Sequence, residues 1–348
     1  METKRLQGLT KARLTELLER MRHCRAVLIG DMCLDVYWFA DLTQSKLSRE
    51  TPHFPLPVVS EKMSAGAGGN AAVNLSVLCD NVTPLGVIGN DWRGQCLREV
   101  FAEQGLPTKQ LVVAKGRVTN AYCKPMRRGY AGIDVEDPRI DFEMSEPLDA
   151  ASEQALLAQL EQACATADVL CVSDQFAFGC ISQRVRERIN QLAENGLLTV
   201  VDSRSRIGLY RHCVLKPNEI ECPRALAELG AEVQLTVTDE AGVQHCAAEL
   251  GRLTACDVCL TLGAQGCLVQ RGGESVRVSA VPVAPPVDTV GAGDCFLSAF
   301  SLALAAGATD KEAGIIGSLA SAITVKKIST TGSASREEIL ALFDREAT

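Results

Sequence analysis

The run Asp288-Thr-Val-Gly-Ala-Gly-Asp294, followed by the apolar stretch CFLSAFSLALAAG, has the clearest chemical potential in this chain. Gly291, Ala292 and Gly293 let the backbone turn tightly into the start of a helix, where unpaired N–H groups and the helix dipole favour an anion. A carboxylate at that place, Asp294, would repel a static phosphate, but it suits a general base that takes a proton from an attacking hydroxyl. The alternative is an ordinary helix cap in which the small residues serve close packing.

A second glycine-rich turn, Ser64-Ala-Gly-Ala-Gly-Gly-Asn70, leads into the helical run AAVNLSVLC. It nearly matches a dinucleotide fingerprint, which would make the chain an oxidoreductase, but no acidic residue ends a following strand at the expected distance. We therefore expect Gly68, Gly69 and Asn70 to offer amides and a carboxamide to the hydroxyls of a small polar ligand.

Two further motifs suit a nucleotide. In Lys216-Pro-Asn-Glu-Ile-Glu221, the side chains of Asn218 and Glu221 are three residues apart, on one face of a first helical turn. There they could hold hydrated Mg²⁺ and phosphates, or they are ordinary polar residues of a helix start. In Thr261-Leu-Gly-Ala-Gln-Gly266, Thr261, Gly263 and Gly266 either allow close approach of the backbone to a ligand or form a plain hairpin turn. A Walker A loop is absent, since no glycine is followed by lysine.

The elements that position these motifs alternate between short apolar runs and helical segments. The predicted strands are 25–30, 82–88, 169–173, 198–202 and 256–262, and the predicted helices are 94–104, 148–164, 181–194, 292–306 and 310–326. This alternation predicts an α/β fold with a mostly parallel central sheet covered by helices on both faces. Ligands in such sheets lie at the carboxyl ends of the strands, where the first strand is followed by Asp31 and Asp35.

Two segments, about 36–63 and 111–147, are poor in helix-forming residues and carry short alternating runs such as TNAYCKP and RIDFEM. We expect them to form a small β-layer, or lid, over one face of the main domain. With no internal repeat or flexible linker in sight, residues 1–348 are interpreted as one domain with the lid inserted in it.

Composition excludes several classes of protein. The chain has 348 residues, 47% of them hydrophobic, and a net charge of −8 without a Lys/Arg-rich run, which argues against nucleic acid. No apolar stretch is long enough for a membrane span, and the charged N-terminus lacks the apolar core of a signal peptide. The fifteen cysteines are odd in number and lie mainly in apolar runs, so we expect free thiols in the cytoplasm. Cys256 and Cys259 stand on a predicted strand, where they would face opposite sides, so no zinc site is expected.

Taken together, in this order and at these separations, the four motifs resemble those of the ribokinase-like (PfkB) carbohydrate kinases. The likeness extends from about Arg25 to Phe343. Within the family, it is closest to the kinase module of the bifunctional enzymes of ADP-heptose synthesis. That likeness rests on GDMCLDVYW (30–38), SRETP (48–52), RIDFE (139–143) and VSD (172–174).

The resemblance implies a role for each motif. It makes Asp294 the catalytic base, makes the amides of Gly291 to Gly293 an anion hole, and assigns Asp31 and Asp35 to sugar hydroxyls together with Gly68, Gly69 and Asn70. It implies that Asn218 and Glu221 organise Mg²⁺ and phosphate, and that Thr261, Gly263 and Gly266 border ATP. It also implies that Asp288 and Val290 hold a monovalent cation such as K⁺, and that the lid is shared between the subunits of a homodimer.

Three stretches depart from the heptose kinase pattern: Gln175–Gly179, Ser203–Arg206 and Lys327–Thr330. The first two lack lysines that are common in those enzymes. Other cations could bind a substrate phosphate in their place, although each could equally be a solvated surface residue. The candidates are Lys124, Arg127, Arg128, Arg204 and Arg206.

The predicted function is ATP-dependent phosphoryl transfer to a hydroxyl of a sugar or sugar phosphate, with a heptose 7-phosphate-like substrate as the leading candidate. A kinase for an unphosphorylated sugar or a nucleoside is an alternative. A sensor that binds a sugar or nucleotide on the same fold without catalysis is another, although a sensor would not need Asp294.

Overall fold

The computed structural model describes residue 6 and the ranges 8–231, 233, 235–328 and 332–347. Its main body is a nine-stranded sheet in the order β14-β13-β12-β11-β10-β9-β1-β4-β5. The strands from β12 through β10, β9 and β1 to β5 are parallel, whereas β13 and β14 continue the sheet as antiparallel hairpins. The predicted mostly parallel sheet is confirmed.

The strands of this sheet are short and mainly buried. Their bounds are β1 Arg25–Gly30, β4 Asn81–Gly89, β5 Leu111–Ala114, β9 Val169–Asp174, β10 Thr199–Ser203, β11 Val214–Leu215, β12 Asp257–Thr261, β13 Cys267–Arg271 and β14 Glu274–Val278.

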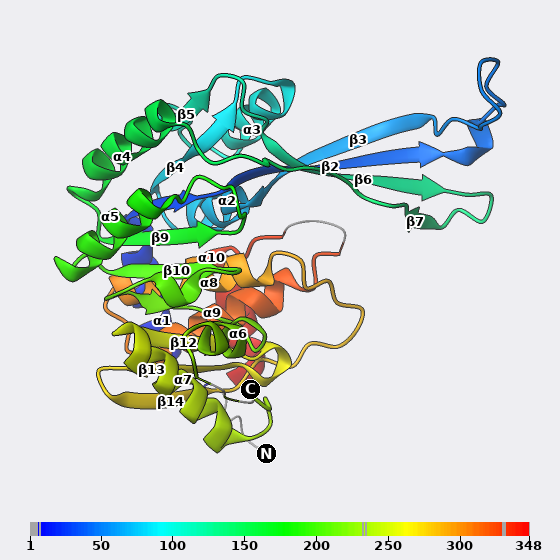
Figure 1. Cartoon of the computed structure of the whole chain (residues 1–348). Helices are drawn as coiled ribbons and strands as arrows, with labels where there is room; N and C mark the ends of the chain where they lie inside the picture. Colours follow the sequence, from blue (N-terminus) through cyan, green and yellow to red (C-terminus); the bar gives the residue numbers. More distant parts are fainter. Residues whose placement is uncertain (1–5, 7, 232, 234, 329–331, 348) are drawn as a thin grey trace.

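Helices cover both faces of the sheet (Figure 1). Their bounds are α1 Lys11–His23, α2 Gly68–Leu78, α3 Trp92–Glu103, α4 Ala150–Cys164, α5 Gln183–Glu194, α6 Glu221–Glu228, α7 Glu240–Thr254, α8 Ala292–Ala305, α9 Asp310–Thr324 and α10 Arg336–Ala347. Three short 3₁₀ turns are η1 Leu42–Gln44, η2 Ile207–Leu209 and η3 Gly263–Gln265.

The alternation of side chains along β1 divides the core into two layers. Ala26 and Leu28 belong to the apolar cluster formed with α1, α2, α8 and α9. Val27 and Ile29 belong to the opposite cluster, formed with α4, α5, α6 and α7. Successive residues of a strand point to opposite faces, so a strand covered on both sides is apolar on both, as β1 is from Ala26 to Ile29.

A second sheet projects from the main body as an arm (Figure 1). Its strands are β2 Met32–Asp41, β3 Val58–Ala67, β6 Asn120–Arg128, β7 Asp134–Glu136 and β8 Ile140–Phe142. The lid predicted from two separate segments is thus one sheet, in which β2 pairs with both β3 and β6. One boundary was wrong: residues 111–114 form β5, which pairs with β4 in the main sheet.

Most predicted element boundaries lie within two residues of the observed ones. Capping explains part of this agreement. At α9, the Thr309 hydroxyl accepts from the Glu312 amide and the Glu312 carboxylate accepts from the Thr309 amide, which is a capping box. Ser335 and Glu338 make the same exchange at α10. Among the described residues, no helix is both long enough and apolar enough to cross a bilayer.

Candidate active site

The first turn of α8 carries the predicted anion-binding motif at the carboxyl end of the main sheet. Gly291 precedes the helix with φ 79°, a left-handed conformation that favours glycine. Ala292 begins the helix, and its N–H donates to the Thr289 carbonyl at 3.2 Å. The amides of Gly293 and Asp294 lie in the first turn, where N–H groups have no acceptor within the helix. Two amides of this helix end are therefore available for an anion.

Asp294 is held in place by a side chain from α2. The Asn70 Nδ2 atom donates to Asp294 Oδ2 at 2.7 Å, and Asn70 is buried. One turn further along α2, Asn74 Nδ2 donates to the carbonyl and to the side-chain oxygen of Asn70, at 2.9 and 3.2 Å. These bonds fix the amide orientation of Asn70, so that its nitrogen faces Asp294. Asn70 was predicted to bind hydroxyls of a ligand. In the structure it also orients the carboxylate of Asp294.

Burial raises the pKa of Asp294 to about 7, and the carboxylates Asp202 and Asp35 contribute to the rise. The hydrogen bond from Asn70 and the charge of Lys216 act in the opposite direction and lower this pKa. A carboxyl with a pKa near neutrality can accept a proton efficiently and release it again at physiological pH. Such a shift is typical of a group that performs acid–base chemistry.

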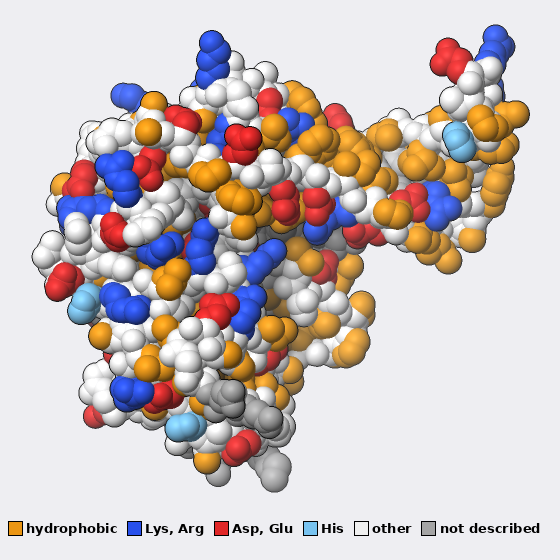
Figure 2. Space-filling view, in the orientation of Figure 1, with side chains coloured by type: hydrophobic (Ala, Val, Ile, Leu, Met, Phe, Trp, Pro, Cys, Tyr) orange, Lys and Arg blue, Asp and Glu red, His pale blue; other side chains and the backbone are white. Residues whose placement is uncertain are grey.

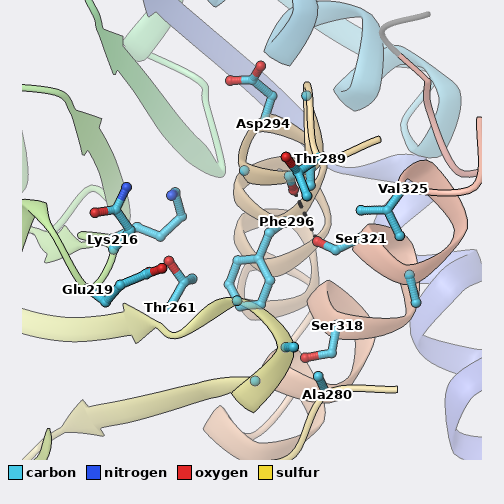
Figure 3. Close-up of a pocket in the computed structure, with 18 of the residues that line it drawn as sticks. Lys216, Glu219, Thr261, Ala280, Thr289, Asp294, Phe296, Ser318, Ser321 and Val325 are labelled. Atoms are coloured by element: carbon cyan, nitrogen blue, oxygen red, sulfur yellow. Dashed lines mark hydrogen bonds between the residues drawn. The ribbon is translucent and has the colours of Figure 1, made fainter. Parts of the chain in front are cut away.

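Two cavities meet at Asp294. The larger one, of about 670 Å³, lies between the start of α8 and the loops after β11 and β12 (Figure 3). The smaller one, of about 480 Å³, lies between the same helix end and the base of the arm. Gly291 and Asp294 line both cavities. A ligand in each cavity would thus border the same carboxylate.

In the larger cavity, a buried lysine faces the start of α8. Lys216 is 3% exposed, and its ammonium pairs with Asp202 at 3.2 Å. Its Nζ atom would be 3.9 Å from a Cβ atom placed on Gly293, which puts a positive charge beside the free amides (Figure 3). The sequence interpretation named neither Lys216 nor Asp202 as a site residue. The available signal was a lysine directly after a buried strand.

The structure shows Asn218 and Glu221 as partners in a helix cap. Asn218 Oδ1 accepts from the amides of Ile220 and Glu221, and Glu221 Oε2 accepts from the Asn218 amide at 3.0 Å. Asn218 therefore precedes α6, and the expectation that it lies on the first turn itself was wrong. Both side chains line the larger cavity, and Glu221 keeps its second oxygen available there.

Two carboxylates of the larger cavity suit a magnesium site. Among the described residues, no group of three or more His, Cys, Asp or Glu side chains is arranged to hold a metal ion by itself. Asp202 and Glu221 do line one cavity. Burial and the charge of Asp202 together raise the pKa of Glu221, so a bound cation would stabilise the two carboxylates in their charged form. Mg²⁺ is often bound through one or two carboxylates together with substrate phosphates. The residues fit that mode.

The Thr261–Gly266 motif satisfies both alternatives left open by the sequence. It forms the turn of the antiparallel β12–β13 hairpin through η3. Thr261, Gly263 and Gly266 also line the larger cavity. Gly266 has φ 86°, and a Cβ atom there would be 2.0 Å from the Val278 carbonyl oxygen. Only glycine fits this position without a shift of the backbone.

The smaller cavity contains a buried carboxylate with one unused oxygen. Asp35 Oδ2 accepts from the Lys124 ammonium at 3.4 Å, and the same ammonium donates to the Tyr37 hydroxyl at 2.9 Å. Asp35 Oδ1 is buried without a hydrogen-bond partner. Buried polar atoms are nearly always paired in folded proteins. Asp35 lines the smaller cavity, although its unpaired oxygen itself lies buried beside Gly66.

Asp31 does not face either cavity, in contrast to the expectation that it binds the ligand. Its oxygens accept from three backbone amides in the loop after β9, those of Gln175, Phe176 and Cys180, at 2.6 to 2.8 Å. A Cβ atom on Gly179 would collide with this carboxylate. Asp31 thus shapes the loop that departs from the heptose kinase pattern.

Gly68 and Gly69 also differ from expectation, because both are buried inside the fold. Gly68 packs on the backbone of Asp31, and Gly69 packs on Ala65 and Phe101. The neighbouring residues Gly66 and Ala67 line the smaller cavity in their place. Gly68 is needed here for the close approach of α2 to the end of β1.

Most of the candidate phosphate-binding cations are engaged by carboxylates. Lys124 pairs with Asp35, and the other engaged side chains form the ion pairs Arg127–Asp137, Arg128–Asp134 and Arg206–Asp174. The cations that line the smaller cavity are Lys124, Arg139 and Arg204. Arg139 stacks over the Tyr122 ring at 4.1 Å and pairs with Asp141.

Asp288 and Val290, the predicted cation ligands, line the smaller cavity near the start of α8. Asp288 is fixed by a bond from its amide to the Val325 carbonyl at 2.8 Å, and its carboxylate accepts from the Val290 amide at 3.0 Å. Part of the divergent stretch 327–330 lies outside the described residues. Cys256 and Cys259 are free thiols.

Fold and site together define a phosphotransferase of the ribokinase-like class. Residues 26–337 match the model of the "pfkB family carbohydrate kinase", so the chain belongs to the PfkB family of carbohydrate kinases.

Among curated relatives, the chain is similar to the bifunctional protein HldE of Citrifermentans bemidjiense, at 30% identity over 92% of this chain and 63% of the relative. It is also similar to the bifunctional protein HldE of Desulfatibacillum aliphaticivorans, at 28% identity over 88% of this chain and 60% of the relative. The chain thus spans about three fifths of the length of these relatives.

Two solved structures share the fold. Ribokinase of Arabidopsis thaliana, complexed with ribose and ATP, aligns with a TM-score of 0.67 at 18% identity, covering 92% of this chain and 98% of that chain. Phosphofructokinase-2 of Escherichia coli, in complex with potassium, aligns with a TM-score of 0.68 at 19% identity, covering 93% and 100%. These likenesses confirm the predicted ribokinase-like fold.

Proposed function

We propose that this protein transfers the terminal phosphoryl group of ATP to a hydroxyl of a phosphorylated sugar, with a heptose 7-phosphate-like acceptor as the leading candidate. The observation that carries the proposal is the position of Asp294, at the meeting point of two cavities and at the end of a helix with free amides. One cavity serves the nucleotide and the other serves the acceptor.

In this proposal, Asp294 takes the proton of the acceptor hydroxyl. The hydroxyl oxygen forms a new bond to the terminal phosphorus of ATP while the bond from that phosphorus to the bridging oxygen breaks, and ADP leaves with the electron pair. The amides of Gly293 and Asp294 and the ammonium of Lys216 stabilise the negative charge of the transferring group. Donors that are fixed in advance at such a place are worth roughly 3 kcal/mol each.

The larger cavity would hold the nucleotide with Mg²⁺, which neutralises phosphate charge when bound. Glu221 and Asp202 would hold the ion, directly or through water, and Asn218 would fix the orientation of Glu221 through their shared cap. Thr261, Gly263 and Gly266 would border the nucleotide. Asp288 and Val290 are proposed ligands of a monovalent cation such as K⁺.

The smaller cavity supports a sugar acceptor. Asp35 would accept a hydrogen bond from a sugar hydroxyl, and Gly66 and Ala67 supply adjacent backbone. The similarity to HldE proteins and the arginines of this cavity support a phosphorylated acceptor. The alternative, an unphosphorylated sugar or a nucleoside, rests on the departures from the heptose kinase pattern between Gln175 and Arg206.

A panel assay tests the proposal. ADP release would be measured with ATP and Mg²⁺ on heptose, hexose and pentose phosphates, the matching free sugars and nucleosides. We expect turnover on sugar phosphates, highest with a heptose 7-phosphate. Turnover on free sugars or nucleosides alone would favour the alternative, whereas nucleotide binding without turnover on any acceptor would favour a sensor.

A further inference from the structure

Among the described residues, four line both cavities: Gly291, Asp294, Gln175 and Arg204. The first two form the helix end and the base described above. Arg204 is therefore the only shared lining residue with a permanent positive charge. A phosphoryl group transferred between the two cavities would lie at the boundary that these residues share.

The guanidinium of Arg204 is unused. Within the part of the chain that the structure describes, its side chain makes no hydrogen bond or ion pair, while its backbone amide is fixed by the Asp174 carbonyl at 3.0 Å. Its charge is nevertheless close enough to the Tyr122 hydroxyl to lower the pKa of that group, against the stronger effect of burial. Arg204 and Tyr122, a residue of the arm, line the same smaller cavity.

Arg206, two residues further along the same loop, differs from Arg204 because its side chain has a partner. Its guanidinium binds the buried Asp174, which also accepts from the Ser203 and Tyr210 hydroxyls. Arg206 is thus part of the framework that holds the loop, and Arg204 is left without a structural partner. A guanidinium presents five donors in a fixed fork, a geometry that matches phosphoryl oxygens.

We propose that Arg204 is a catalytic cation that contacts the phosphoryl group in transit between the two cavities. The inference rests on the proposed function. Its guanidinium neutralises the charge that the equatorial oxygens carry while the bond to ADP breaks and the bond to the acceptor forms. Arg204 then acts on transfer itself, whichever acceptor occupies the smaller cavity.

The first test compares steady-state kinetics of Arg204→Gln and Arg139→Gln on a phosphorylated sugar and on the matching free sugar. We expect Arg204→Gln to lower kcat about 100- to 1,000-fold on both acceptors, with little change in KM. Arg204→Lys should recover part of the loss. A rise in KM for the phosphorylated acceptor alone, with kcat unchanged, would assign Arg204 to substrate binding and overturn the inference.

A second test needs no acceptor. Binding of Mg-ADP would be titrated with and without aluminium fluoride, which mimics the transferring group. We expect aluminium fluoride to tighten binding to the wild-type protein, and Arg204→Gln to lose that gain while its affinity for Mg-ADP alone stays unchanged. An equal gain in the variant would refute a role of Arg204 in transfer. A wild-type protein with no gain and no turnover would instead contradict the proposed function itself.

Discussion

At the residue scale, the account depends on how the protein sets the pKa of one carboxyl. Asp294 combines burial, which raises its pKa to about 7, with a hydrogen bond from Asn70, which lowers it. Removing that bond in Asn70→Ala should raise the pKa further. We expect the rising limb of kcat/KM against pH to move to higher pH, while activity at high pH is partly retained. A pH profile of both proteins measures this shift, and an unchanged midpoint would argue that Asn70 does not tune Asp294.

The same carboxyl should lower the stability of the folded protein. Its folded-state pKa lies above its ordinary value of 3.8, so ionisation opposes folding, and this cost grows as pH rises from about 4 to about 7. Asp294→Asn removes the cost. We expect the variant to gain more thermal stability over the wild type at pH 8 than at pH 5, as followed by circular dichroism. A gain that is the same at both pH values would contradict the raised pKa.

At the element scale, the loop after β10 depends on one buried ion pair. Asp174 is fully buried and is neutralised by Arg206. Because Arg206→Gln would leave this carboxylate without its cation, we expect a loss of about 3–5 kcal/mol in the free energy of unfolding. Urea denaturation measures the loss, and Arg204→Gln is the matched control two residues away. If Arg206→Gln and Arg204→Gln lowered the free energy of unfolding by the same small amount, the Arg206–Asp174 pair would contribute little to stability.

The sequence predicted elements better than it predicted side-chain directions. Apolar runs such as Arg25–Gly30 and caps such as Thr309 with Glu312 are local signals, so strand and helix boundaries could be inferred. Whether Asp31 faces a cavity or a loop depends on residues 144 to 149 positions away along the chain. For the same reason, the burial of Lys216 beside α8 and the membership of 111–114 in the main sheet could not be predicted.

At the scale of the whole molecule, the arm is the most conspicuous feature. It carries many exposed apolar side chains, as Figure 2 shows. Tyr130 is 88% exposed and Phe54 is 65% exposed. Large exposed apolar patches on a soluble protein usually mark an interaction surface. We propose that the arm pairs with that of a second copy of the chain to form a homodimer, in agreement with the expectation from sequence.

Exposed residues of β3 allow a test of the dimer. Val58 and Val59 are each about half exposed, and the register between β2 and β3 shifts beside them. We expect the double variant Val58→Glu/Val59→Glu to dissociate the dimer, because it places two charges on the apolar surface of the arm. Sedimentation velocity of the variant and of the wild type measures this change. A wild-type protein that is monomeric at micromolar concentration would contradict the proposal.

The most direct test of the central claim is the pH dependence of phosphoryl transfer by the wild-type protein and by Asp294→Asn, measured as ADP release on the best acceptor of the panel. Asp294 must be ionised to accept a proton, so kcat/KM of the wild type should rise with pH and level off above about 7. The variant should lose at least 100-fold in kcat and show no such rise. An Asp294→Asn protein that retains wild-type turnover would show that the carboxylate between the two cavities is not the base.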